Sequence, residues 1–169
     1  YASQAFRTTG LSANEYMENV TGFSASLLQS LGGDTAKAAE IANTAMVDMA
    51  DNSNKMGTSM EAIQNAYSGF AKQNYTMLDN LKLGYGGTKT EMQRLLKDAQ
   101  KLTGVKYDIN SLSDVYEAIH AVQGELGITG TTALEASSTL QGSFSAMKAS
   151  FSDLLGAMST GGNISAQLE

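Results

Sequence analysis

Residues 79–104 read DNLKLGYGGTKTEMQRLLKDAQKLTG, and the expected fold follows from this stretch outward. Three glycines, Gly84, Gly86 and Gly87, fall within four positions. Because glycine adopts positive φ without strain, we expect a helix to end and the chain to turn here. Thr88 and Glu91 follow at the spacing of a capping box. In that motif the Thr88 hydroxyl accepts from the N–H of Glu91, and the Glu91 carboxylate returns to the N–H of Thr88.

After this cap, apolar residues recur at the spacing of one helix face, which predicts an amphipathic helix ending at Gly104. The residues of that face are Met92, Leu95, Leu96, Ala99 and Leu102. The same Ser/Thr-x-x-Glu start, followed by a helical period, occurs at Ser12, Thr58, Thr88 and Thr132. This pattern predicts an all-α protein, a bundle of about six helices with short glycine-rich turns and a longer amphipathic C-terminal helix.

Other helix boundaries are expected from capping residues. Asp34 is a good N-cap for a helix that should fray through the polar run at residues 51–55. A new helix should begin at Thr58 through the second capping box. Ser113 or Ser111 should cap a later helix. Residues 1–130 are therefore predicted to form the helical bundle domain.

The long C-terminal helix is predicted for residues 131–160, followed by a tail at 161–169. It carries a heptad-like seam with spacings of 4, 3, 4, 3 and 4 residues. The seam consists of Leu140, Phe144, Met147, Phe151, Leu154 and Met158. Such a seam must bury its apolar side chains, either against the preceding helices or, projecting outward, against a second copy or a partner. The seam is therefore the candidate partner-contact surface.

Composition excludes several classes of function. The 169 residues include 11 Lys and Arg against 17 Asp and Glu, a net charge of −6 that argues against tight nucleic acid binding. There is no cysteine, hence no disulfide and no Cys-based zinc site. No window of 18 uncharged apolar residues predicts a membrane span. Because the chain starts at Tyr1 without a methionine, we expect it to be a segment of a longer protein.

Motifs for catalysis or for cofactors fail on their details. Thr88 separates the glycines from Lys89, which breaks the residue order of a phosphate-binding loop. Glu117 and His120 form one Glu-x-x-His, whereas a di-iron bundle needs two. Residues 51–63 lack the final glutamate of an EF-hand, and no G-x-S-x-G elbow occurs. The sole histidine, His120, is expected to face solvent or to bond locally, and we expect no catalytic, cofactor-binding or metal-binding residues, no cofactor and no enzymatic activity.

Four stretches carry a resemblance to a known family. They are GYGGTKTEMQRLLKDAQKLTG at 84–104, GFAKQNYTMLDNLKLG at 69–84, SLGGDTAKAAEIA at 30–42 and AIHAVQGELGITGTTALEASSTLQGS at 118–143. Together they resemble the tail tape measure proteins of tailed bacteriophages and prophages, of the type found with Gram-positive hosts. The similarity covers roughly residues 9–155 and extends to the order of the residues as well as to their composition.

The resemblance implies a structural function. Tape measure proteins are long, mostly helical chains inside the tail tube that set the length of the tail and leave ahead of the DNA during ejection. It implies other copies of the chain, tail-tube subunits, assembly chaperones or the baseplate hub as partners, and a place in the virion tail after assembly in the host cytoplasm. The alternative is a helical protein-binding module that docks through its C-terminal seam. A cell-wall hydrolase is a third, less favoured class, because no suitable site is visible.

Overall fold

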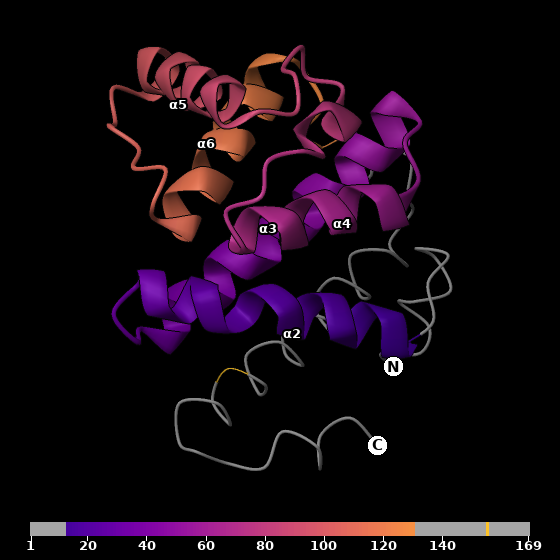
Figure 1. Ribbon diagram of the computed structural model, residues 1–169, viewed down its shortest axis with the longest axis vertical. Helices are drawn as coiled ribbons and strands as arrows, with labels where there is room; N and C mark the ends of the chain where they lie inside the picture. The colour runs from indigo at the N-terminus through magenta and orange to yellow at the C-terminus, as the bar shows by residue number, and fades with distance from the viewer. Residues whose placement is uncertain (1–12, 131–154, 156–169) are drawn as a thin grey trace.

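The computed structural model describes residues 13–130 and Leu155, and this part of the chain is helical without a strand (Figure 1). The elements are α2 (Ala13–Ser30), α3 (Thr35–Met56), α4 (Met60–Ala71), the 3-10 helix η1 (Leu78–Leu81), α5 (Lys89–Thr103) and α6 (Leu112–Glu125). The all-α prediction is confirmed for these residues. The long helix predicted for 131–160, which would complete a bundle of about six, lies outside the described residues apart from Leu155, which is helical and fully buried.

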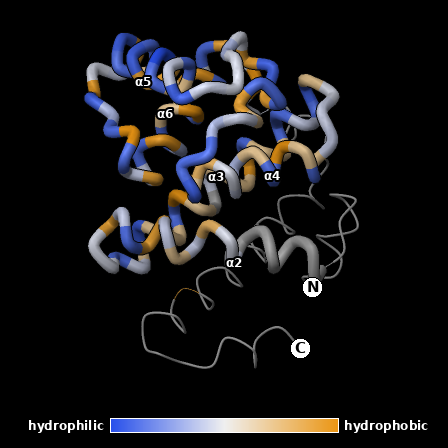
Figure 2. Tube along the Cα trace, viewed as in Figure 1, coloured by the Kyte–Doolittle hydropathy of each residue, from blue (hydrophilic) through white to orange (hydrophobic). Residues whose placement is uncertain are grey.

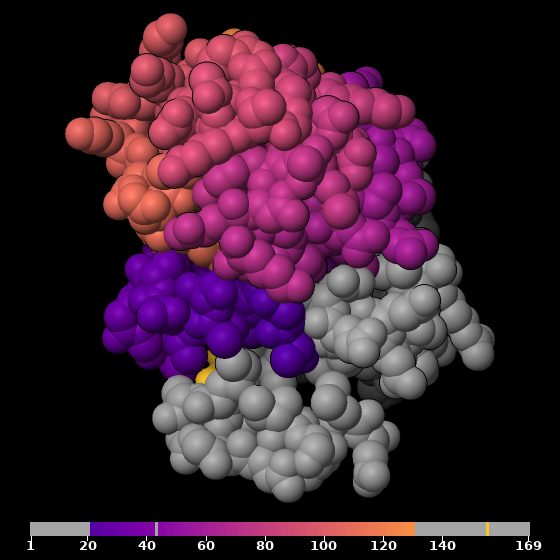
Figure 3. All heavy atoms as spheres, viewed as in Figure 1, coloured from indigo at the N-terminus to yellow at the C-terminus, as the bar shows by residue number. Residues whose placement is uncertain are grey.

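The α6 helix is the element that joins the others, since it contacts α2, α3, α4 and α5. In Figure 1 the α2 helix runs along one edge of the described body, and α5 lies towards the opposite end. On the face seen in Figure 3, the segment from α4 to α5 forms a continuous surface beside α2. None of the helices in residues 13–130 is long and apolar enough to cross a bilayer.

An aromatic group marks the centre of the core, where α2, α4 and α6 meet. The rings of Phe23 and Tyr116 pack edge-to-face with centroids 5.7 Å apart, and those of Tyr67 and Tyr116 lie 5.0 Å apart. All three side chains are buried. Pairs of this kind add about 1 kcal/mol each beyond the burial of apolar area. The Tyr116 hydroxyl donates to the carbonyl oxygen of Tyr67 at 2.9 Å, so α6 is also hydrogen-bonded to α4.

The α5 helix is largely hydrophilic and buries one narrow face (Figure 2). Met92, Leu95, Leu96 and Ala99 are buried as the stripe predicts. Leu102 belongs to the same stripe but is 45% exposed, so the prediction that it packs inward was wrong. The buried face of α5 ends a turn before the helix itself.

The polar run at residues 51–55 does not fray. The α3 helix continues through it to Met56, and Asp51 and Asn52 are fully buried. The prediction was wrong because a polar run frays only where its side chains face solvent, and two of these do not. Asp51 and Asn52 instead form hydrogen bonds inside the protein, and those bonds support the last turns of α3.

The α4 helix starts one residue later than predicted. Its N-cap is Ser59, whose Oγ accepts from the backbone N–H of Ala62 at 3.2 Å. Thr58, the predicted cap, donates its hydroxyl to the carbonyl oxygen of Asn80 at 3.0 Å and so ties the start of α4 to η1. Asp34 caps α3 as predicted, and Ser111, one of the two predicted candidates, caps α6.

Candidate functional site

The first candidate region is the glycine corner, which we define as residues 84–98, from the three glycines through the first turns of α5. Gly84 has φ +92°, which glycine adopts without strain. Gly86 and Gly87 do not have positive φ, so Gly84 alone of the three glycines adopts the left-handed conformation. The reason for glycine at position 87 is space: a Cβ on Gly87 would lie 2.9 Å from the carbonyl carbon of Thr76 and closer still to its oxygen.

The helix start at Thr88 differs from a standard capping box in one bond. The Thr88 hydroxyl accepts from the backbone N–H of Glu91 at 3.1 Å. The Glu91 carboxylate, expected to return to the N–H of Thr88, accepts instead from the N–H of Gly86 at 3.1 Å. One carboxylate therefore fixes the glycine turn itself to the first turn of α5.

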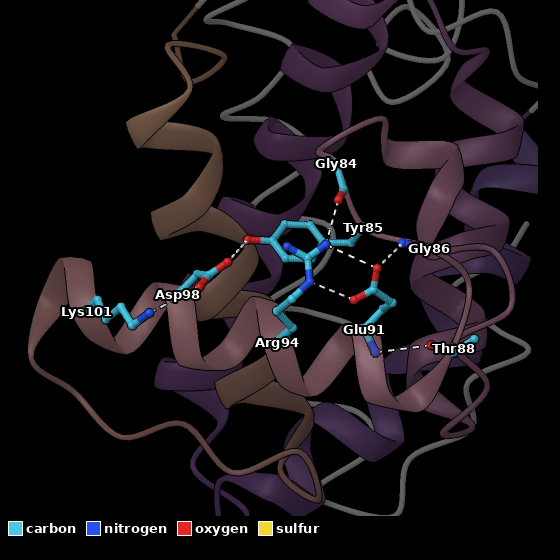
Figure 4. Close-up of polar contacts among 8 residues, drawn as sticks. All are labelled: Gly84, Tyr85, Gly86, Thr88, Glu91, Arg94, Asp98 and Lys101. Atoms are coloured by element: carbon cyan, nitrogen blue, oxygen red, sulfur yellow. Dashed lines mark hydrogen bonds and ion pairs between the residues drawn. The ribbon is translucent and has the colours of Figure 1, made fainter.

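Arg94 completes the corner (Figure 4). Its guanidinium lies 4.2 Å from the centre of the Tyr85 ring and donates to the Glu91 carboxylate and to the carbonyl oxygen of Gly84, each at 2.7 Å. The Tyr85 hydroxyl donates to Asp98 at 2.6 Å. The polar groups of the corner thus bind one another, within a span of fifteen residues, and they shape a turn.

The ionisation of the corner follows from these bonds. Hydrogen bonds from Arg94 and from the Gly86 N–H lower the pKa of Glu91 to about 2. Burial and the hydrogen bond to Asp98 raise the pKa of Tyr85 to about 12. Both groups keep one charge state throughout the neutral range, so the corner is not suited to exchanging protons.

The second candidate region was not predicted. It is a group of polar side chains between α3 and α6, which we call the buried polar seam. Asp48, Asp51, Asn52 and Gln123 are buried, and the partly exposed His120 lies at its edge. Asn52 Nδ2 donates to the carbonyl oxygen of Leu81 at 2.9 Å and to Gln123 Oε1 at 2.8 Å. Gln123 Nε2 donates to the Asp48 carbonyl oxygen at 3.2 Å, and the N–H of Gly130 donates to Asp51 at 2.8 Å. Apart from the bond of Asn52 to Leu81 in η1, these bonds join residues that are 71 to 79 positions apart in the sequence.

His120 belongs to this polar seam. The expectation that it faces solvent or bonds locally was wrong, because it bonds to a residue 72 positions away. Its Nδ1 lies 2.9 and 3.0 Å from the two carboxylate oxygens of Asp48 on α3. The Asp48 side chain is 1% exposed and that of His120 is 45% exposed. The hydrogen bond with Asp48 raises the pKa of His120 above its ordinary value. Burial raises the pKa of Asp48, although its bond with His120 acts in the opposite direction.

A surface hollow of about 410 Å³ lies beside this pair, between α3, the end of α5 and α6. His120 forms part of its wall together with Tyr107 and Tyr116. At its edge Lys37 lies 3.8 Å from Glu40 and 4.0 Å from Glu117. Within residues 13–130 and at Leu155, no three His, Cys, Asp or Glu side chains are grouped so as to hold a metal ion. The chemistry this hollow offers is proton exchange at a histidine held by a buried carboxylate.

The predicted partner-contact seam, from Leu140 to Met158, lies outside the described residues. Leu155, which follows the seam member Leu154, is fully buried and belongs to the hydrophobic core.

The chain was compared with protein-family models, with curated proteins and with solved structures, and none of the three comparisons finds a match.

The sequence did contain one signal of the buried polar seam. Asn52 follows Met49 by three residues and precedes Met56 by four, so it lies on the apolar stripe of α3. A polar residue at an inward position of a helix is expected to have a buried hydrogen-bonding partner. The pairing of Asp48 with His120 had no such signal, because it depends on how two distant helices meet.

Proposed function

We propose that this chain is a structural helical segment of a phage tail tape measure protein, without enzymatic activity. The observation that carries the proposal is the resemblance of residues 84–104, supported by three further stretches between 30 and 143. The helical character of residues 13–130 is compatible with it. By the same resemblance, its partners are other copies or tail proteins (tube, assembly chaperones, baseplate hub), and its location is the virion tail after assembly in the host cytoplasm.

Within such a protein, we propose that residues 13–130 act as a folded module rather than as part of the ruler. A helical ruler gains about 1.5 Å of length per residue, and residues far apart in sequence then lie far apart in space. Hydrogen bonds between Asn52 and Gln123, and between Asp51 and Gly130, hold residues 71 and 79 positions apart in direct contact. A segment that folds back on itself in this way adds little to the length of the tail that the protein sets.

The proposal is tested by deleting the gene that encodes the chain and examining the induced particles by electron microscopy. We expect capsids without tails, and we expect peptides of residues 13–130 in tails purified from the wild type by mass spectrometry. Normal tails in the deletion strain, or tails that lack these peptides, contradict the proposal. Incubation of the purified chain with cell walls tests the absence of hydrolytic activity, and release of muropeptides contradicts it.

A further inference from the structure

Among the described residues, the buried carboxylate of Asp48 has a partner that solvent can reach, His120. Asp48 on α3 is 1% exposed, and within residues 13–130 its carboxylate is hydrogen-bonded to the imidazole of His120 on α6. The imidazole is 45% exposed and forms part of the hollow wall. Protons can therefore reach and leave His120 directly, whereas Asp48 is shielded from water.

We propose that Asp48 and His120 form a pH-dependent switch between α3 and α6. A proton on His120 closes the switch, and loss of that proton as pH rises loosens the His120 turn of α6 from α3. Removing one member of a buried ion pair leaves the other charge without compensation, and this is strongly unfavourable. Deprotonation of His120 acts in the same direction but more weakly, because a hydrogen bond from the neutral ring to Asp48 remains.

The surroundings of His120 favour its protonated form. The charged and titratable groups that face it or share its hollow are Lys37, Glu40, Asp48 and Asp51 on α3, Glu117 and Tyr116 on α6, and Tyr107 before α6. Four carboxylates thus oppose one ammonium group. The hydrogen bond to Asp48, followed by the charges of Asp48, Asp51 and Glu117, raises the pKa of His120 although partial burial lowers it.

The direction of the effect follows from proton linkage. A histidine whose pKa is raised on folding stabilises the fold below its unfolded value of about 6.5, and this stabilisation is lost as pH rises through the folded value. The raised pKa of Asp48 concerns the acidic range in which that carboxyl loses its proton, and the ion pair with His120 exists only above that range. Loss of the His120 proton therefore makes the contact between α3 and α6 weaker as pH rises.

The loosening is expected to be local. Gln123 and Asn52, which join α6 to α3 and η1, have amide side chains that do not titrate. The aromatic contact between Tyr116 and Tyr67 is likewise retained, because burial raises the pKa of both hydroxyls well above 10. The part of α6 that responds is the turn around Glu117 and His120, at the hollow.

The test uses amide hydrogen exchange of the whole chain at pH 6.0 and pH 8.5, corrected for the intrinsic rate of each amide. We expect the opening constant of amides near His120 to rise roughly threefold, as for loss of a partly exposed ion pair. In His120→Gln, which keeps a hydrogen-bond donor but does not titrate in this range, the opening constant should not change with pH. Equal pH dependence in both proteins overturns the proposal.

Two measurements guard against misinterpretation. Glu117→Gln changes a charge beside His120 without touching its bond to Asp48, so the rise with pH should persist in it, and its loss in this variant contradicts the proposal. Because His120 is the only histidine in the chain, its imidazole signals can be titrated in the wild-type protein even if His120→Gln does not fold. A midpoint at or below about 6.5 overturns the proposal.

Discussion

The glycine corner and the buried polar seam both fix the position of helices through polar side chains, but the partners are close in sequence in the corner and distant in the seam. In the corner, Thr88, Glu91 and Arg94 bond to groups at most ten positions away, and about half of the Arg94 side chain is exposed to solvent. In the seam, Asn52 and Gln123 are fully buried and bond to each other across 71 positions. The corner sets the direction in which α5 leaves the turn, and the seam sets how α3 and α6 lie together.

The difference shows where stability and pH sensitivity reside. Exposed ion pairs contribute little, because water already solvates both partners. Removing one partner of a buried hydrogen bond lowers the stability of the fold more, since the remaining group then lacks both water and a hydrogen bond. We therefore expect substitutions in the seam to be more damaging than those of charged groups in the corner, with Gly87 as the exception on steric grounds.

The largest effect is expected from Gly87→Ala. A Cβ at this position meets the backbone carbonyl of Thr76, which cannot move aside as a flexible side chain can. We expect a loss of about 3 kcal/mol in the free energy of unfolding, measured by urea denaturation. Gly86→Ala is the matched control, because its Cβ would meet only the Glu91 side chain at 3.5 Å. Equal losses in the two variants would contradict the steric reason for glycine at position 87.

The next effect is expected from Gln123→Met, which keeps the length of the side chain and removes its hydrogen bonds. Asn52 Nδ2 and the Asp48 carbonyl oxygen each lose a partner in a buried setting. We expect a loss of about 2 kcal/mol in the free energy of unfolding. Gln100→Met on the exposed face of α5 should change it by less than about 0.5 kcal/mol. Equal losses in the two variants would contradict the prediction that the hydrogen bonds of Gln123 stabilise the fold.

A smaller loss is expected from Thr88→Ala, which removes the cap of α5. The N–H of Glu91 then loses its acceptor, and we expect a loss of about 1 kcal/mol in urea denaturation. Thr90→Ala, two residues on and also exposed, is the control and should be close to neutral. A neutral Thr88→Ala would mean that the carboxylate of Glu91 alone is enough to start the helix.

The smallest effect on stability is expected from acid titration of the corner. Because the pKa of Glu91 is lowered to about 2, its contribution is fully present above pH 4.5, declines below that pH and is gone once pH has fallen through about 2. An NMR titration of the Glu91 carboxyl group should give a midpoint near 2, and Arg94→Ala should move it towards 4.5. Lys101→Ala, which removes a contact with Asp98, should leave the midpoint in place. An unchanged midpoint in Arg94→Ala assigns the shift to the Gly86 N–H alone.

The same contrast explains what the sequence could reveal. Thr88 and Asp34 are capping residues recognisable from a few neighbours, and the stripe of α5 is a local period. A side chain at position 87 would clash with Thr76, and His120 bonds to Asp48. Neither contact can be predicted from a helical period or a capping motif, because each depends on how distant segments meet. The polar run at 51–55 was misjudged for the same reason, because its hydrogen-bonding partners come from α6 and from the turn after it.

The proposal that residues 13–130 form a folded module within a tape measure protein is tested most directly by tail length. Deleting these 118 residues in frame removes about 180 Å of continuous helix if they act as a ruler, at 1.5 Å per residue. Electron microscopy of the particles gives the lengths of the tails. The account predicts tails of wild-type length. Tails shortened by about 180 Å would contradict it.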